Sequence, residues 1–361
     1  MKTLFKKLFN TYRINFLLLF LLSCSTYSSE ELISPNISLH QEIINNNQIV
    51  YLKISNPDLV SFEIGFADKG NFNKRKPVEK ILEENNATAG INLSFFGYDY
   101  NKFKEGDVRG YCIVNGELMK SRSIWDLWMD TLLIYTANKN IQFYKLEKTP
   151  GIKLEVNGTI ISDDLSINIS LWGNKKDYVL FFNEYGSSYI SSEFNKLFIL
   201  KGNSKLFINA NNSFKVENIT NNQQNFSFPL LCSVKDNILD NVKSGDLINI
   251  ETDFSDVIKN SLFSVSVGSI ILMGGKYLEI QKEFDINENK SFVGILKTGE
   301  ILIGCTLMKH SDLAKTLIDL NVSDSVLLDG GGSSCLNVKG KNIFGGNRDV
   351  VTALLIEDKN D

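Results

Sequence analysis

The stretch that most constrains this chain is residues 326–335, Val-Leu-Leu-Asp-Gly-Gly-Gly-Ser-Ser-Cys. Its apolar start predicts a buried strand that ends at the carboxylate of Asp329. Three consecutive glycines bring no side chain to a core and cost backbone entropy, so they belong where the backbone turns sharply or closely approaches another group. The hydroxyls of Ser333 and Ser334 follow. Two interpretations stay open: a tight turn between strands, and a place to hold a polar ligand.

Two phosphate-binding loops do not fit this stretch. No Lys-Ser or Lys-Thr pair follows the glycines, which excludes the nucleoside-triphosphate loop. Residues 336–339 predict a further strand rather than a helix, so a dinucleotide-binding turn is also excluded.

Composition excludes other functions. The net charge of −4 includes no basic excess, which argues against a nucleic-acid partner. The chain has two histidines, His40 and His310, far apart in sequence, so a His-rich zinc site is not expected. No cofactor is expected, and the cysteine spacings fit no metal motif.

The first residues have the pattern of a targeting segment. Lys2, Lys6 and Lys7 precede an apolar run at 16–22, and Cys24 follows a small residue. Leu-Leu-Ser-Cys at 21–24 resembles a bacterial lipobox, with a plain secretory signal as the alternative. We therefore expect a lipoprotein signal peptide at 1–23, lipidation of Cys24 and a flexible polar tether at 24–48. The protein is expected to be exported to the bacterial cell envelope and held on a membrane by acyl chains.

Four cysteines remain in the body of the chain: Cys112, Cys232, Cys305 and Cys335. An exported protein with four cysteines can form two disulfides, with three possible pairings. Four buried free thiols are the alternative, and the sequence does not choose between them.

From residue 49 onward, short runs rich in β-branched and aromatic residues alternate with turn residues and predict many strands. Helices are predicted at 78–86 and at 311–320. No composition shift marks an internal boundary. The sequence therefore predicts a single α+β domain at 49–358, built on mainly antiparallel strands with a few helices.

Asn92 is a polar residue inside an otherwise apolar predicted strand within residues 87–97. A buried amide must find hydrogen-bond partners. It either ties down its own loop or belongs to a site.

These elements together resemble the phosphodiester glycosidases related to the uncovering enzyme, N-acetylglucosamine-1-phosphodiester alpha-N-acetylglucosaminidase. The specific match is Asp-Gly-Gly-Gly-Ser-Ser at 329–334, with Arg348 ahead of Val-Val-Thr-Ala-Leu at 350–354. Gly-Ile-Asn-Leu-Ser-Phe-Phe at 90–96 and Lys-Ser-Phe-Val-Gly at 290–294 match two further family elements. The matches run in order from about 87 to 357.

The chain departs from the family pattern at several positions. Leu93 and Ser94 stand where the family has two glycines, Lys290 replaces an arginine, and Asn347 stands where the family often has Glu. Lysine lacks the bidentate fork that suits phosphate.

The resemblance implies a hydrolase that cleaves the bond between a sugar's anomeric carbon and a phosphodiester. It assigns the acid, base or charge-stabilising role to Asp329 and phosphate contact to Arg348 and Lys290. The alternative role for Arg348 is to form a structural ion pair with Asp329. The resemblance implies that the catalytic residues are Asp329, Arg348 and Asn92. It implies that the substrate-binding residues are Lys290, Ser291, Gly330, Gly331, Gly332, Ser333 and Ser334.

A second carboxylate is not evident, with Asp99, Glu184 and Asp349 as unranked candidates. The expected partner is a phosphorylated carbohydrate or glycopolymer of the bacterial envelope or exopolysaccharide. A surface lipoprotein that binds such glycans without cleaving them is the alternative, and a purely structural envelope lipoprotein is a third hypothesis. The intact 329–334 block favours the first two.

Overall fold

The computed structural model describes residues 28–44, 47–68, 72, 74–97, 108–123, 126, 128–169, 177–182, 194, 196–220, 228–233 and 239–360. The predicted signal peptide and Cys24 lie outside these residues. Among the residues described, no helix has the length and apolar character needed to cross a membrane.

The described residues are mostly β-structure, so the expected α+β class is wrong. Their strands form four mainly antiparallel sheets. The α-helices in this part of the chain are α2 (Val78–Asn85), α3 (Asp256–Lys259) and α4 (His310–Asp319). The two predicted helices are therefore real, but each is a short cover on the outer face of a sheet and neither forms a helical layer.

The first sheet, which we call the long sheet, carries the strand that leads into the glycine loop. Its order is β1-β2-β3-β22-β21-β23-β19-β20. The bounds are β1 (Ser28–Ser34), β2 (Ile37–Ile44), β3 (Asn47–Ile54), β22 (Ile301–Met308), β21 (Glu288–Leu296), β23 (Val322–Leu327), β19 (Ile270–Met273) and β20 (Lys276–Tyr277).

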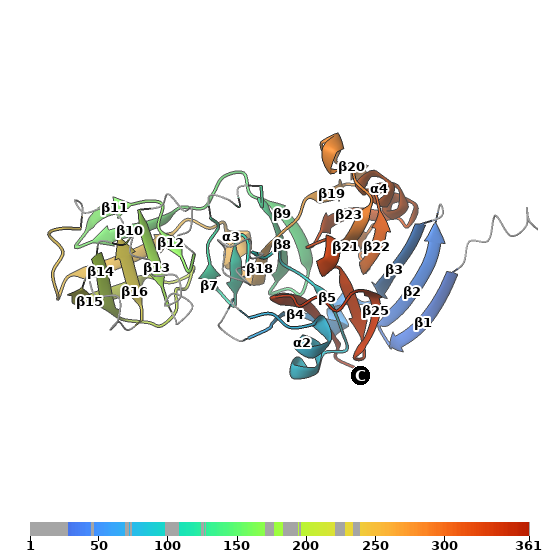
Figure 1. Ribbon diagram of the computed structural model, residues 1–361, viewed down its shortest axis with the longest axis horizontal. Coiled ribbons are helices and arrows are strands. Elements are labelled where there is room, and N and C mark those ends of the chain that lie inside the picture. The colour runs from blue at the N-terminus through green and yellow to red at the C-terminus, as the bar shows by residue number, and fades with distance from the viewer. Residues whose placement is uncertain are drawn as a thin grey trace, which may run out of the picture.

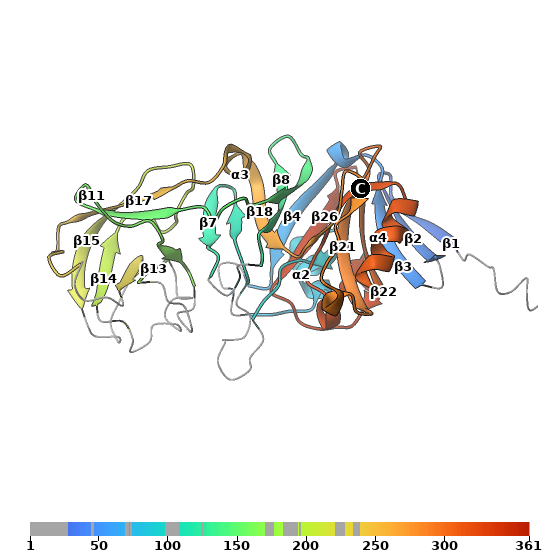
Figure 2. The ribbon, with the colours of Figure 1, turned by 90° about the horizontal axis from the view of Figure 1, so that it is seen from above.

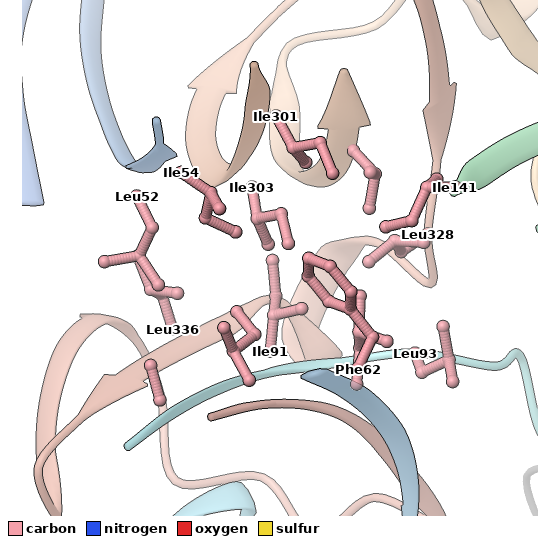
Figure 3. Packing of buried hydrophobic residues seen from close by; sticks show 14 of the residues in the cluster. Leu52, Ile54, Phe62, Ile91, Leu93, Ile141, Ile301, Ile303, Leu328 and Leu336 are labelled. Atoms are coloured by element: carbon pink, nitrogen blue, oxygen red, sulfur yellow. The ribbon is translucent and has the colours of Figure 1, made fainter. Parts of the chain in front are cut away.

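The second sheet, which we call the short sheet, faces the long sheet across an apolar core. Its order is β25-β24-β5-β26-β4, with bounds β25 (Lys341–Gly345), β24 (Cys335–Val338), β5 (Ala89–Asn92), β26 (Thr352–Asp358) and β4 (Val60–Phe66). Figure 3 shows Leu52 and Ile303 of the long sheet opposite Ile91 and Leu336 of the short sheet. Burial of this apolar surface is what fixes the two sheets against each other.

Two further sheets extend the molecule. The middle sheet has the order β7-β6-β18-β8-β9 and the distal sheet the order β11-β10-β17-β15-β14-β16-β13-β12. Figures 1 and 2 both place the distal sheet at the end of an elongated molecule, far from β1. Their bounds are β6 (Cys112–Val114), β7 (Glu117–Lys120), β8 (Thr131–Thr136), β9 (Ile141–Lys145), β18 (Ser261–Val267), β10 (Ile152–Val156), β11 (Thr159–Ser162), β12 (Ser166–Ile167), β13 (Tyr178–Phe181), β14 (Lys196–Lys201), β15 (Asn212–Thr220), β16 (Leu230–Ser233) and β17 (Leu247–Thr252).

The segment expected to be a flexible tether contains ordered strands. Ser28–Ser34 and Ile37–Ile44 pair as β1 and β2, and β2 pairs with β3 of the long sheet. The carboxylate of Asp358 holds the turn between them, because it accepts hydrogen bonds from Ser34 Oγ at 2.7 Å and from the Asn36 backbone N–H at 2.9 Å. The polar composition suggested disorder, but backbone pairing with β3 and the hydrogen bonds to this buried carboxylate order the segment.

The four cysteines of the body, Cys112, Cys232, Cys305 and Cys335, are buried free thiols. Of the two alternatives that the sequence left open, this structure has the free thiols.

Candidate functional site

The loop after β23 carries the glycines and places Asp329 between the two facing sheets. The Leu328 N–H donates to the Ser291 carbonyl at 2.8 Å, and the Asp329 N–H donates to the Leu93 carbonyl at 3.1 Å. One bond goes to the long sheet and the other to the chain that leaves the short sheet. The carboxylate is therefore held where the two sheets meet.

Two of the glycines are required by geometry. Gly331 has a φ of +60°, a left-handed backbone that side chains disfavour. A Cβ on Gly332 would lie 2.9 Å from the Arg348 guanidinium. The loop is thus a tight turn, but its shape also leaves room for Arg348 to lie directly against the backbone.

Asn92 lies beneath the loop, fully buried at the end of β5. Its Nδ2 donates to the Asp329 carbonyl at 2.6 Å. Its Oδ1 accepts from Ser291 Oγ at 2.7 Å and from the Cys335 N–H at 3.0 Å. Asn92 and Ser291 therefore support the loop from behind rather than facing a ligand.

A pocket of about 310 Å³ opens above this loop. Its lining is formed by Phe95, Glu288, Lys290, Leu327, Leu328, Asp329, Gly330, Gly331, Gly332 and Arg348. Of the residues predicted for the site, Lys290, Asp329, the three glycines and Arg348 meet here. Ser333 instead hydrogen-bonds the Asp329 carboxylate, and Ser334 is buried with no hydrogen-bond partner for its Oγ among the described residues.

The Asp329 carboxyl has unusual electrostatics. Part of the residue faces the pocket, but protein atoms crowd its carboxyl group, and this loss of water raises its pKa from 3.8 to about 7. Hydrogen bonds from Ser333 and the Gly330 N–H and the charge of Arg348 act in the opposite direction and are weaker. Near neutral pH this carboxyl is therefore poised between its acid and base forms.

Two cationic side chains share the pocket with Asp329. Lys290 is 3% exposed, and its Nζ lies 2.9 Å from Glu288 Oε1. Arg348 lies against Gly332 and acts on the Asp329 carboxyl through its charge. The pocket thus combines two cationic side chains with a carboxyl that can be neutral.

The model of the phosphodiester glycosidase family matches residues 85–357. The chain belongs to this family. The match spans the pocket-lining residues, all of which come from Phe95 onward.

Two solved structures with TM-scores above 0.5 share the fold of this chain. A hypothetical protein from Synechocystis aligns with a TM-score of 0.72 and 14% identity, over 92% of this chain and 64% of its own. A Burkholderia pseudomallei K96243 protein described as exported aligns with a TM-score of 0.62 and 14% identity, over 88% of this chain and 74% of its own. The catalytic domain of zebrafish N-acetylglucosamine-1-phosphodiester alpha-N-acetylglucosaminidase gives a TM-score of 0.41 at 14% identity, over 92% and 82%. No relative was found among curated protein sequences.

The second carboxylate of the pocket was not found by the sequence analysis. Glu288 lines the pocket, whereas Asp349 is exposed and does not, and Asp99 and Glu184 lie outside the described residues. A signal for Glu288 was present, because it lies two residues before Lys290 on the same face of one strand. Phe95 also lines the pocket, although the sequence analysis predicted no role for it beyond its place in the motif at 90–96. Within the described residues, no cluster of three or more His, Cys, Asp or Glu side chains is placed to hold a metal ion.

The raised pKa of Asp329 predicts a stability effect. Because the folded state binds its proton more tightly than the unfolded state, Asp329 costs stability as the pH rises from about 4 through 7. Asp329→Asn removes that cost, so the free energy of unfolding at pH 8 should rise by on the order of 1–4 kcal/mol. Urea denaturation at pH 8 and pH 4.5 measures it, with a smaller gain expected at pH 4.5. Equal stabilities of the two proteins at both pH values would contradict the raised pKa.

Proposed function

We propose that this protein hydrolyses sugar-1-phosphodiesters, breaking the bond between the anomeric carbon and the phosphate oxygen. The observation that carries the proposal is the combination in one pocket of Asp329, whose pKa is about 7, with the cations Lys290 and Arg348. A phosphodiester needs positive charge, and a leaving phosphate oxygen benefits from a proton donor. Membership in the phosphodiester glycosidase family supports the same chemistry.

Arg348 and Lys290 bind the phosphodiester in this proposal. The Arg348 guanidinium offers a planar fork for two phosphate oxygens, and Lys290 adds a point charge. Glu288 holds the Lys290 ammonium in place through the 2.9 Å contact. The N–H groups of the glycine loop offer further donors to phosphate or sugar oxygens.

Asp329 acts as the general acid. As the bond between the anomeric carbon and the phosphate oxygen breaks, its electron pair leaves with that oxygen, which takes the proton of Asp329. The resulting carboxylate then faces an oxocarbenium-like carbon, which it stabilises. Water supplies the new oxygen on the sugar, and Glu288, the other carboxyl of the pocket, is the candidate to take the water's proton.

The proposed setting is the bacterial cell envelope. The charged start, the short apolar run and Cys24 support export and lipid anchoring. A structurally similar Burkholderia pseudomallei protein is described as exported, which agrees with this setting. Phosphorylated glycans of the envelope or of exopolysaccharide are the substrates that such an enzyme would meet.

Kinetics on small substrates test the roles of the two principal residues. The substrates are methyl phosphodiesters of glucose, galactose and N-acetylglucosamine, in both anomeric forms, and free sugar is measured. Asp329→Asn should nearly abolish turnover while the circular dichroism spectrum is retained. Arg348→Lys should mainly weaken binding, by on the order of 1.5–3 kcal/mol or about ten- to a hundredfold in KM. For the wild type, kcat/KM should fall above about pH 7, because the acid form of Asp329 is then lost.

Asp349→Asn is the matched control, because this neighbouring carboxylate is exposed and outside the pocket. A folded Asp329→Asn protein with near-normal turnover would remove Asp329 from catalysis. Tight binding of a phosphodiester by the wild type without release of sugar would favour the glycan-binding alternative.

The lipid anchor has its own test. Cys24→Ala should leave the body folded but release it from membranes, because the acyl chains are its anchor. Fractionation of cells fed a labelled fatty acid measures both effects. A wild type that incorporates no label, with a mutant that stays on the membrane, would refute the anchor.

A further inference from the structure

Two side chains of β21 bring opposite charges into the pocket. Glu288 and Lys290 are two residues apart on one strand, so their side chains lie on the same face. Both line the pocket, and Lys290 Nζ lies 2.9 Å from Glu288 Oε1. At that separation the carboxylate cancels much of the field of the ammonium.

The two members of this pair differ in their exposure. The Lys290 side chain is 3% exposed, whereas that of Glu288 is 42% exposed. The carboxylate is therefore the more accessible charge, and an anion that enters the pocket meets it as well as the buried ammonium. A second negative charge on that anion adds repulsion by Glu288 to the attraction by Lys290.

The other groups leave the pocket without a large positive excess. Arg348 adds a second cation, and the Asp329 carboxyl adds a negative charge once the pH exceeds about 7. His310, on which the charge of Lys290 acts, adds none, because burial and that charge lower its pKa to about 4. At pH 8 the described lining therefore carries the positive charges of Lys290 and Arg348 against the negative charges of Glu288 and Asp329.

Hydrolysis changes the charge of the phosphate group. A phosphodiester carries a single negative charge. The phosphate monoester that remains after the sugar leaves ionises a second time near about pH 6, so at pH 8 it is close to a dianion. The product is thus the more strongly charged anion, and a pocket with a large positive excess would retain it.

We propose that Glu288 sets the charge specificity of the pocket: it allows the singly charged phosphodiester to bind but denies the doubly charged monoester product a gain in affinity. This rests on the proposed function. The effect is opposite in sign to that of holding Lys290 in place. A group that only holds the lysine strengthens the binding of every phosphate anion, whereas a repelling charge weakens it, and weakens it most for the dianion.

The experiment measures the dissociation constants of methyl phosphate and dimethyl phosphate at pH 8 and low ionic strength, by phosphorus-31 NMR titration. Neither probe has a glycosidic bond, so binding is measured apart from hydrolysis. In the wild type, the second charge of methyl phosphate should bring no large gain in affinity. In Glu288→Gln, the ratio of the two constants should shift about three- to tenfold in favour of methyl phosphate.

Two further variants make the comparison specific, with circular dichroism as the check on folding. Glu288→Asp retains the charge and should keep the wild-type ratio. Glu83→Gln is the matched control, because Glu83 pairs with Lys80 at 2.7 Å on α2 and does not line the pocket. It removes the same charge from the protein as a whole and should also keep the wild-type ratio.

A ratio in Glu288→Gln that is unchanged, or that shifts in favour of dimethyl phosphate, would overturn the role of Glu288. Failure of both anions to bind either protein would overturn it too. Absence of sugar release from sugar-1-phosphodiesters would instead contradict the hydrolase proposal, and the two probes would still decide the charge specificity of binding.

Discussion

One buried amide holds four segments of the chain together beneath the pocket. The Asn92 side chain joins the end of β5 to the Asp329 carbonyl, to Ser291 on β21 and to the start of β24. Two of these contacts cross from the short sheet to the long sheet or to the loop that leaves it. An unsatisfied buried group costs about 1–3 kcal/mol, so each contact favours this one arrangement of the loop. The position of Asp329 depends on it.

The electrostatics of the pocket follow from that position. Crowding by protein raises the pKa of Asp329 even though Arg348 stands near it, so desolvation outweighs the attraction of the cation. Ionising such a carboxyl lowers the stability of the folded protein. Its raised pKa also makes it a better proton donor near neutral pH. Lys290, which pairs with Glu288 on the neighbouring strand β21, adds positive charge to the pocket. It is not among the groups that shift the pKa of Asp329.

Much of the local structure could be predicted from the sequence, because strands, turns and helices α2 and α4 have short-range patterns. The predicted fold class was wrong because the two predicted helices were counted as a major part of the fold. Each is only a short helix on the outer face of a sheet. The strands at 28–44 were missed because polar side chains on an edge hairpin resemble a disordered tether. The meeting of Lys290, Asp329 and Arg348 was expected only from a family resemblance. The supporting role of Asn92 and the pocket positions of Glu288 and Phe95 depend on long-range packing that no local pattern reports.

The central claim is that Asp329 is held in a desolvated position that raises the pKa of its carboxyl to about 7, so that acid and base forms coexist near neutral pH. The most direct measurement follows the carbon-13 NMR signal of its side-chain carboxyl as the pH is changed. The signal is assigned to Asp329 because it disappears in the Asp329→Asn variant. The account predicts a midpoint of about 7. A midpoint near 3.8, the ordinary value for aspartate, would contradict it.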